Sequence, residues 1–217
     1  MKKKTLVIHP TDPSTDFLTV IYKGRGFTEI HEDFEATRLQ SAIEEHDRIL
    51  LLGHGYPNGL LNYYETIIDE SFVPVLRGKE LVGIWCYAKA FFERHQLPGF
   101  HTDMFISEID EAMIMGVDST EKAIDVSNYT FSKLVRKYLF HPQMYERIMQ
   151  GYKYIRTPVA LFNWDRLYFR DESGVLHGNA NPPAPNAMAE FMEQGLEEVS
   201  KMIRDNPNLF THFLPKL

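Results

Sequence analysis

Arg48-Ile49-Leu50-Leu51-Leu52-Gly53-His54-Gly55 is the stretch of this chain that decides its fold. After Arg48 the stretch runs through four apolar residues without interruption, which is typical of a parallel strand covered on both faces. The run stops at Gly53, and a glycine next to a polar residue indicates that the strand gives way to a turn at His54. The stretch therefore predicts a central strand of a largely parallel sheet.

Other short apolar runs on either side of this strand alternate with amphipathic segments. Strands are expected at residues 6–8, 27–31, 64–68, 81–85, 104–106 and 159–162. Helices are expected at residues 17–22, 36–45, 71–77, 87–95, 120–137, 142–152 and 186–204. Alternation of strands and helices predicts a sheet with helices on both faces, because each crossover between parallel strands lays a helix on the sheet.

The fold predicted from this pattern is a three-layer α/β/α domain with a mostly parallel central sheet and a C-terminal helical elaboration. The 217 residues suit a single domain. Within it we expect a sheet core over residues 1–118 and a helical insertion or cap over 119–157. We expect the last strand and a C-terminal helix in residues 158–217.

Composition excludes several classes of protein. The net charge is −7, and no basic stripe of the kind that drives nucleic-acid binding is present. No apolar run approaches the roughly 20 residues of a membrane helix, and the N-terminal run is too short for a secretory signal. Cys86 is the single cysteine, so no internal disulfide can form, which suits a reducing compartment. We expect a cytoplasmic protein without nucleic-acid or membrane partners, and the sequence leaves its oligomeric state open.

His54 and Cys86 follow two consecutive buried strands, each at the point where the strand ends. Ligands of open α/β sheets bind beyond the carboxyl ends of the strands, so we expect the two side chains to share one edge. A histidine there can take the thiol proton, and the N-terminus of the helix after Cys86 favours the thiolate. Glycines on both sides of His54 would let a substrate backbone approach closely. The alternative is that Cys86 is inert core packing.

An apolar strand ending in His-Gly, followed by an apolar strand ending in Cys, resembles the caspase-like cysteine peptidases of clan CD. The stretches 49–55 and 82–86 carry this resemblance, which covers about residues 5–110. It implies a caspase-like sheet with His54 as the base and Cys86 as the nucleophile. It also implies that the backbone N–H groups of Gly55 and Cys86 stabilise the oxyanion, and that the substrate is a peptide or a small molecule.

Polar side chains after the other expected strands are candidates for a substrate pocket beside this pair. The candidates are Asp12, Asp16, Tyr56, Ser107, Glu108, Asn163 and Asp165. Together with Asp110 and Glu111, the carboxylates could hold a basic side chain, although Asp16 and Glu108 would equally serve as helix N-caps.

Two further interpretations stay open. His9, His31 and His54 follow successive strands, and with Asp12 they could form a metal site, but their spacing favours no metal and no cofactor motif is present. A fold does not fix a function, so the alternatives to a peptidase are a non-catalytic module that binds a peptide or small ligand, and a small-molecule amidase or esterase.

Overall fold

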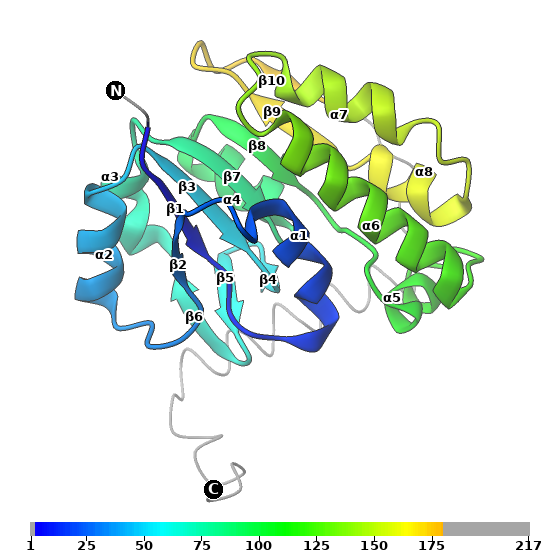
Figure 1. The fold of residues 1–217 in the computed structure, drawn as a ribbon, viewed down its shortest axis with the longest axis horizontal. Coiled ribbons are helices and arrows are strands. Elements are labelled where there is room, and N and C mark those ends of the chain that lie inside the picture. The colour runs from blue at the N-terminus through cyan, green and yellow to red at the C-terminus, as the bar shows by residue number, and fades with distance from the viewer. Residues whose placement is uncertain (1–2, 180–217) are drawn as a thin grey trace, which may run out of the picture.

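A computed structural model describes residues 3–179 of the chain. Its centre is a seven-stranded sheet with the order β10-β9-β8-β7-β3-β1-β2 (Figure 1). Five of these strands are mutually parallel: β1 (Thr5–Ile8), β2 (Thr28–Ile30), β3 (Arg48–Leu52), β7 (Glu80–Ile84) and β8 (Gly99–Thr102). The last two, β9 (Leu167–Arg170) and β10 (Leu176–His177), are antiparallel additions at one edge. The predicted α/β architecture with a mostly parallel sheet is therefore confirmed.

Both faces of the sheet are covered, which explains the continuous apolar strands. Leu51 belongs to a core cluster with residues of α2 (Ala36–Glu44), α3 (Val73–Leu76) and α4 (Ala88–His95). Leu50, which points to the opposite face, packs with residues of α1 (Thr19–Tyr22), α6 (Glu121–Tyr138) and α7 (Met144–Tyr152). Three layers result, with the sheet between the two groups of helices (Figure 1).

A second, smaller sheet continues from the carboxyl end of β3. It is antiparallel and consists of β4 (Gly55–Tyr56), β5 (Gly59–Asn62) and β6 (Glu65–Ile68). The expected strand at 64–68 thus exists but lies outside the main sheet. Short 3₁₀ helices, η1 (Pro13–Leu18) and η2 (Glu70–Phe72), follow β1 and β6.

Two predicted strands are wrong. Residues 159–162 lie in helix α8 (Pro158–Trp164), because Thr157 caps its N-terminus and Pro158 occupies the first turn. Residues 104–106 are buried but irregular, and the strand lies earlier, at Gly99–Thr102. The Asn163 side chain forms the hydrogen bonds to the Ile106 backbone that a neighbouring strand would otherwise form. It accepts from the Ile106 N–H at 2.8 Å and donates to the Ile106 carbonyl at 2.9 Å.

The remaining helix, α5 (Ile109–Ile114), begins a helical segment that continues through α6 and α7 between β8 and β9. The division of the chain into a sheet core, an insertion and a C-terminal part stays a prediction, and the helix expected at 186–204 lies outside the described residues. Within the described part of the chain, none of the helices combines the length and the apolar character that a membrane crossing requires.

Candidate active site

The carboxyl ends of the parallel strands bring His54 and Cys86 to one edge of the sheet. In the pairing of β3 with β7, Leu52 lies opposite Ile84. The Gly53 N–H extends this pairing by donating to the Ile84 carbonyl at 3.0 Å. His54 lies two residues after Leu52, and Cys86 lies two residues after Ile84. Because Leu52 and Ile84 are paired, His54 and Cys86 follow neighbouring strands at the same distance from the end of the pairing.

The His54 ring is held by the turn after β1. Its Nε2 lies 2.6 Å from the Ser14 hydroxyl oxygen and 3.6 Å from Asp12 Oδ1. The Ser14 hydroxyl donates to Asp12 Oδ1 at 2.6 Å. Asp12 also accepts from the Ser14 backbone N–H, since it is the N-cap of η1. One capping residue therefore also fixes the position of the histidine, through a serine that lies between them.

This chain of hydrogen bonds defines the tautomer of a neutral His54. Burial raises the pKa of Asp12, but the hydrogen bonds from Ser14 and the charge of His54 outweigh burial and leave the pKa below its ordinary value. An ionised carboxylate can only accept, so the single Ser14 proton points at Asp12. Nε2 of His54 must then donate to Ser14, which leaves the lone pair on Nδ1. Nδ1 is the atom that can take up a proton.

Cys86 contacts different groups. Its Sγ lies 3.7 Å from the Phe105 carbonyl oxygen and 3.9 Å from Glu111 Oε1. Burial and then the negative charge of Glu111 raise the pKa of the Cys86 thiol far above its ordinary value. The helix N-terminus expected to favour the thiolate is two residues away, at Ala88, and it does not reverse this effect. The thiol is protonated at neutral pH in this arrangement.

Glu111 lies beside the thiol, and no role of its own was expected for it. Its Oε2 accepts from the Ser107 N–H at 2.6 Å and from the Glu108 N–H at 3.1 Å. Burial raises the pKa of Glu111, against these hydrogen bonds and the charge of His54, which lower it. A glutamate three residues after a helix N-cap reaches back to it, and the spacing of Glu108 and Glu111 is a sequence signal that could have located both the helix and this contact.

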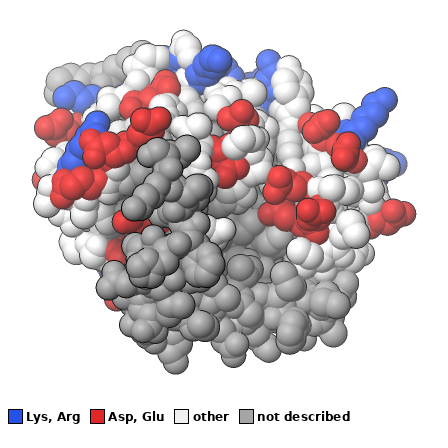
Figure 2. Space-filling view, turned by 90° about the horizontal axis from the view of Figure 1, so that it is seen from below, with Lys and Arg blue, Asp and Glu red and all other residues white. Residues whose placement is uncertain are grey.

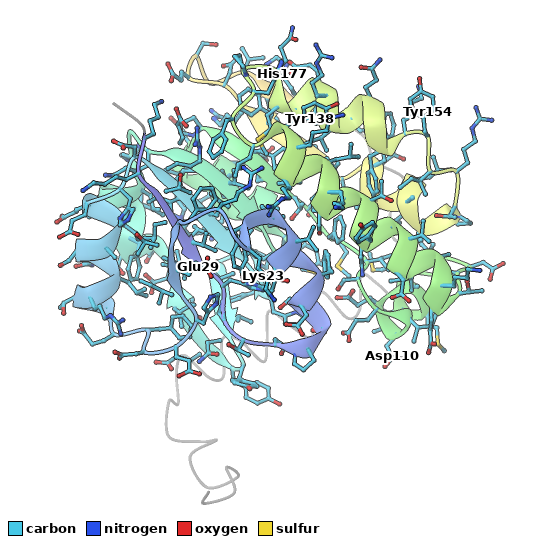
Figure 3. All side chains as sticks on the ribbon, viewed as in Figure 1. Lys23, Glu29, Asp110, Tyr138, Tyr154 and His177 are labelled. Atoms are coloured by element: carbon cyan, nitrogen blue, oxygen red, sulfur yellow. The ribbon has the colours of Figure 1, made fainter. Side chains whose placement is uncertain are left out.

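The other acidic candidates are more remote from the thiol. Asp110 is exposed and projects outward from α5 (Figure 3). Glu108 is the exposed N-cap of α5, and Asp16 is exposed in η1. The N-cap interpretation is thus correct for Glu108 and wrong for Asp16, because Asp12 caps η1 and Asp16 lies within it. Of the acidic candidates, Asp12 contacts His54 and Glu111 contacts Cys86.

Three more of the predicted pocket residues have structural partners. Tyr56 is buried and its hydroxyl lies 2.9 Å from that of Thr66. Asn163 is fully buried and holds the Ile106 backbone, as described above, so it does not line an open pocket. Asp165 ends α8, where its Oδ1 accepts from the Asn179 side chain. Asn163 and Asp165 were expected after a strand, and the helix found there accounts for their different positions.

Gly55 is needed for packing. A Cβ atom at this residue would lie 2.1 Å from Cδ1 of the Trp85 indole and 2.6 Å from the Gly59 carbonyl oxygen. The space expected for a substrate backbone at Gly55 is thus filled by Trp85. The Gly55 backbone N–H does not pair with β5. Leu61 donates to the His54 carbonyl, so the next pair, Gly55 with Leu60, is a non-hydrogen-bonded pair whose N–H groups point away from each other.

The residue after Cys86 has a strained backbone. Tyr87 has φ = 67° in the left-handed region, where a bulky residue is rare, and it is the N-cap of α4. Such strain is of the order of 1–3 kcal/mol and recurs at functional sites. The left-handed conformation of Tyr87 makes the sharp turn between β7 and α4, just after Cys86.

The metal interpretation finds no support in the neighbouring histidines. His9 is 2% exposed, with Nδ1 2.8 Å from the Tyr22 hydroxyl and Nε2 3.1 Å from the Thr15 hydroxyl. Burial and the charges of His31 and His54 lower the pKa of His9 to about 4. Across residues 3–179, no group of three or more His, Cys, Asp or Glu side chains is arranged to hold a metal ion.

Acidic side chains are frequent on one face of the described residues. Figure 2 views the molecule from the side toward which the parallel strands point, and Asp and Glu side chains gather on the coloured part of this face, with Lys and Arg nearer its margins. A small cavity of about 10 Å³ lies beside His54, between Asp12, Thr15 and Leu61. That volume holds one water molecule.

Comparisons with known proteins give no relative for this chain. No family model matches it, and neither a curated protein nor a solved structure matches it.

Proposed function

We propose that this protein is a cysteine-dependent hydrolase of the peptidase type that uses His54 and Cys86 as a dyad. The observation that carries the proposal is the register of β3 and β7, since Leu52 pairs with Ile84 and each functional residue follows two positions later. A nucleophile and a base that follow adjacent parallel strands share the edge where ligands of such sheets bind.

The chemistry is acyl transfer. Nδ1 of His54 takes the thiol proton while Cys86 Sγ forms a bond to the carbonyl carbon of a peptide, amide or ester. The N–H groups of Gly55 and Cys86 are the proposed donors to the oxyanion. The protonated His54 then gives its proton to the leaving amine or alcohol, and water cleaves the thioester to release the acid and the free thiol.

Asp12 and Ser14 have the role of orienting the base. A base that is itself held by a third group is the common pattern of nucleophilic catalysis in proteins. Here the Nε2–H of His54 donates to Ser14, whose proton goes to Asp12. This arrangement stabilises the imidazolium that forms when Nδ1 accepts a proton.

His54 and Cys86 also support a proposal about the type of sheet. The resemblance to caspase-like peptidases of clan CD implies that the strand before the base lies next to the strand before the nucleophile, and we propose a caspase-like sheet. The substrate proposed is a peptide or a small molecule with an amide or ester bond. A catalytic thiol needs a reducing environment, which is the reason to propose a cytoplasmic location.

Hydrolysis of a panel of fluorogenic peptide amides and small esters tests the proposal. We expect turnover that Cys86→Ala abolishes and that His54→Gln lowers at least a hundredfold, the range typical of a lost general base. His141→Gln, a change at an exposed loop histidine, is the matched control and should retain full activity. Turnover that persists in Cys86→Ala would refute the dyad, and a preference for esters over peptides would identify a small-molecule hydrolase.

A second candidate function is favoured by the surroundings of the thiol. Glu111 and burial keep Cys86 protonated, and the Trp85 indole fills the space beside Gly55. Both features suit a non-catalytic module that binds a peptide or small ligand at the same edge. In that case no member of the panel is hydrolysed, and Cys86→Ser leaves ligand binding unchanged.

A further inference from the structure

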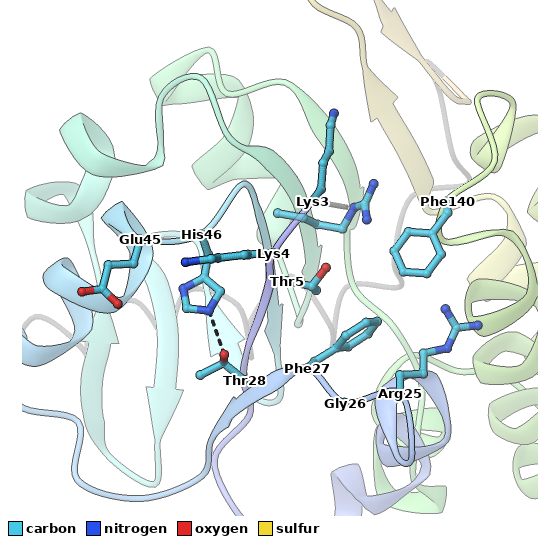
Figure 4. Close-up of a pocket in the computed structure, with 11 residues that line it drawn as sticks. Lys3, Lys4, Thr5, Arg25, Gly26, Phe27, Thr28, Glu45, His46 and Phe140 are labelled. Atoms are coloured by element: carbon cyan, nitrogen blue, oxygen red, sulfur yellow. Dashed lines mark hydrogen bonds between the residues drawn. The ribbon is translucent and has the colours of Figure 1, made fainter. Parts of the chain in front are cut away.

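A second cavity lies at the opposite edge of the sheet, where the parallel strands begin (Figure 4). Its volume is about 700 Å³, within the range of small-molecule sites. The amino ends of β1 and β3 contribute Lys3, Thr5 and Arg48 to its wall, and the loop before β2 contributes Arg25 and Phe27. Phe140, from the turn after α6, closes one side.

Positive charge in this cavity exceeds the negative charge that could neutralise it. Lys3 and Arg48 both form ion pairs with one carboxylate, that of Glu80. Arg25 donates to the Arg136 carbonyl, which uses one of its five donors. Among the described residues, no carboxylate lies within ion-pair distance of Arg25 or of Arg136. Arg25 is thus a cation of the cavity wall without a carboxylate partner among the described residues, and Lys3, Lys4, Arg25 and Arg48 together outnumber Glu45, the acidic residue of the lining.

Aromatic rings hold these cations in position. The guanidinium carbons of Arg48 and Arg25 lie 4.4 and 5.1 Å from the centroid of the Phe140 ring. Phe27 packs edge-on against Phe140 with ring centroids 5.9 Å apart. Stacked guanidinium groups keep donors free at their edges. The cavity therefore presents pre-positioned donors, whereas freely moving lysines would lose more entropy on binding.

The Thr5 hydroxyl is independent evidence that a ligand binds in this cavity. The residue is 4% exposed, and its hydroxyl has no hydrogen-bond partner within the described part of the chain. Figure 4 shows this hydroxyl directed into the space between Lys3, Phe27 and Phe140. A buried polar group without a partner costs about 1–3 kcal/mol, so a group bound in the cavity that accepts or donates a hydrogen bond would remove this cost.

We propose that this cavity binds the phosphate group of a small phosphorylated molecule, with Arg25, Arg48, Lys3 and the Thr5 hydroxyl as its ligands. A phosphomonoester offers three acceptor oxygens and a charge between −1.5 and −2 at neutral pH, which matches several cations and a hydroxyl better than a single carboxylate does. Arginine's planar fork binds phosphate with two parallel hydrogen bonds. The site is independent of His54 and Cys86, which lie beyond the other ends of the same strands.

Titration of the full-length protein with inorganic phosphate, and then with a nucleoside monophosphate and a sugar monophosphate, tests the proposal. Isothermal calorimetry at constant ionic strength in chloride gives the Kd, and the backbone amide shift of Thr5 reports the location. We expect saturable binding of one phosphate per chain. Arg25→Gln should weaken it about tenfold or more, and the isosteric Thr5→Val should weaken it about threefold to tenfold.

Lys122→Gln is the matched control, because it removes one positive charge from an exposed position on α6 outside the cavity. It should leave the Kd within twofold. Thr5→Val keeps the shape of the side chain, so a folding defect is not expected to obscure the result. The proposal is overturned if phosphate causes no saturable change beyond that of chloride, or if Lys122→Gln weakens binding as much as Arg25→Gln does. It is also overturned if a single-stranded oligonucleotide binds with high salt dependence while the monophosphates do not.

Discussion

The side chains at the two ends of the parallel strands differ in whether they have partners within the protein. At the carboxyl ends, each ionisable side chain of the site has a partner in the protein: Ser14 lies between Asp12 and His54, and Glu111 is held by Ser107 and Glu108. At the amino ends, Arg25 lacks a carboxylate among the described residues and the Thr5 hydroxyl lacks any partner. At one edge the charged groups are held by hydrogen bonds within the protein around a thiol, and at the other an arginine and a hydroxyl without such partners face a cavity of about 700 Å³.

This difference separates two kinds of evidence for function. A hydrogen-bonded network fixes the geometry and the protonation states that chemistry needs, so its function is tested by reactivity. An arginine without a carboxylate partner and a buried hydroxyl without a hydrogen bond indicate a place for a bound group, so their function is tested by binding. Variants at one edge should leave the other edge unaffected.

The largest effect is expected from adding a methyl group at the carboxyl edge. Gly55→Ala places a Cβ against the Trp85 indole and the Gly59 carbonyl, and the backbone contact cannot relax as a side-chain tip could. We expect a loss of about 3 kcal/mol in the free energy of unfolding, measured by urea denaturation. Gly151→Ala is the control, since its contact is with the flexible end of Leu134 and alanine favours the helix. Equal stability of Gly55→Ala and wild type would disprove the packing described here.

Acid should destabilise the edge that contains His9. The pKa of His9 is lowered to about 4 by burial and by the charges of His31 and His54, whereas an unfolded histidine titrates near pH 6.5. Between these two pH values the unfolded chain binds a proton at His9 that the folded chain does not bind. The contribution of neutral His9 to the free energy of unfolding is therefore complete above pH 6.5, and it falls by about 3 kcal/mol in total as the pH drops toward 4.

Urea denaturation at pH 7, 5.5 and 4 measures this loss. His9→Gln removes the titrating group and should flatten the profile relative to wild type, although its stability at pH 7 is lower. His141→Gln, at an exposed position, should retain the wild-type slope. If His9→Gln and wild type lose stability in parallel, His9 is not held neutral.

An intermediate effect is expected on the thiol itself. Glu111→Gln keeps the acceptor oxygen toward Ser107 but removes the charge that raises the pKa of Cys86. The thiolate fraction at pH 7 should increase, and the rate of alkylation by iodoacetamide should rise about tenfold. Asp110→Asn, at the exposed neighbour on the same helix, should not change the rate. A slower reaction in Glu111→Gln would contradict the sign of this electrostatic effect.

The smallest effect is expected at the amino edge. Thr5→Val replaces a buried hydroxyl without a partner by a methyl group of the same shape, so the free energy of unfolding in phosphate-free buffer should increase by about 1 kcal/mol. Thr102→Val is the contrasting variant, because the Thr102 hydroxyl donates to the Trp85 carbonyl at 2.8 Å and its loss should destabilise. If Thr5→Val destabilises as much as Thr102→Val, the Thr5 hydroxyl has a partner in the native state.

The sheet and the pair of strand ends could be predicted from the sequence because they depend on local patterns. The apolar runs at 48–52 and 81–85 indicated buried parallel strands, and the residues after them indicated which side chains would lie at the same edge of the sheet. The strand predicted at 159–162 was wrong because four apolar residues fit a buried helix as well as a strand. Thr157 and Pro158 resolve that ambiguity in favour of a helix.

The parts of both sites that depend on tertiary contacts could not be predicted. Glu111 reaches the thiol because the irregular segment after β8 folds back over Cys86. The amino-edge cavity combines residues from four separate segments, from Lys3 to Phe140, and no spacing in the sequence marks them as neighbours. The contact of Ser14 with His54 spans 40 residues, so no local pattern indicates it.

Alkylation of the native protein by iodoacetamide, followed by intact mass, tests the central claim most directly, because Cys86 is the single cysteine and every adduct reports on it. We expect one adduct per native chain at neutral pH, formed at least tenfold more slowly in His54→Gln, with phosphate binding unchanged in that variant. An adduct that forms only after unfolding, or at the same rate in His54→Gln and wild type, would contradict a His54–Cys86 dyad.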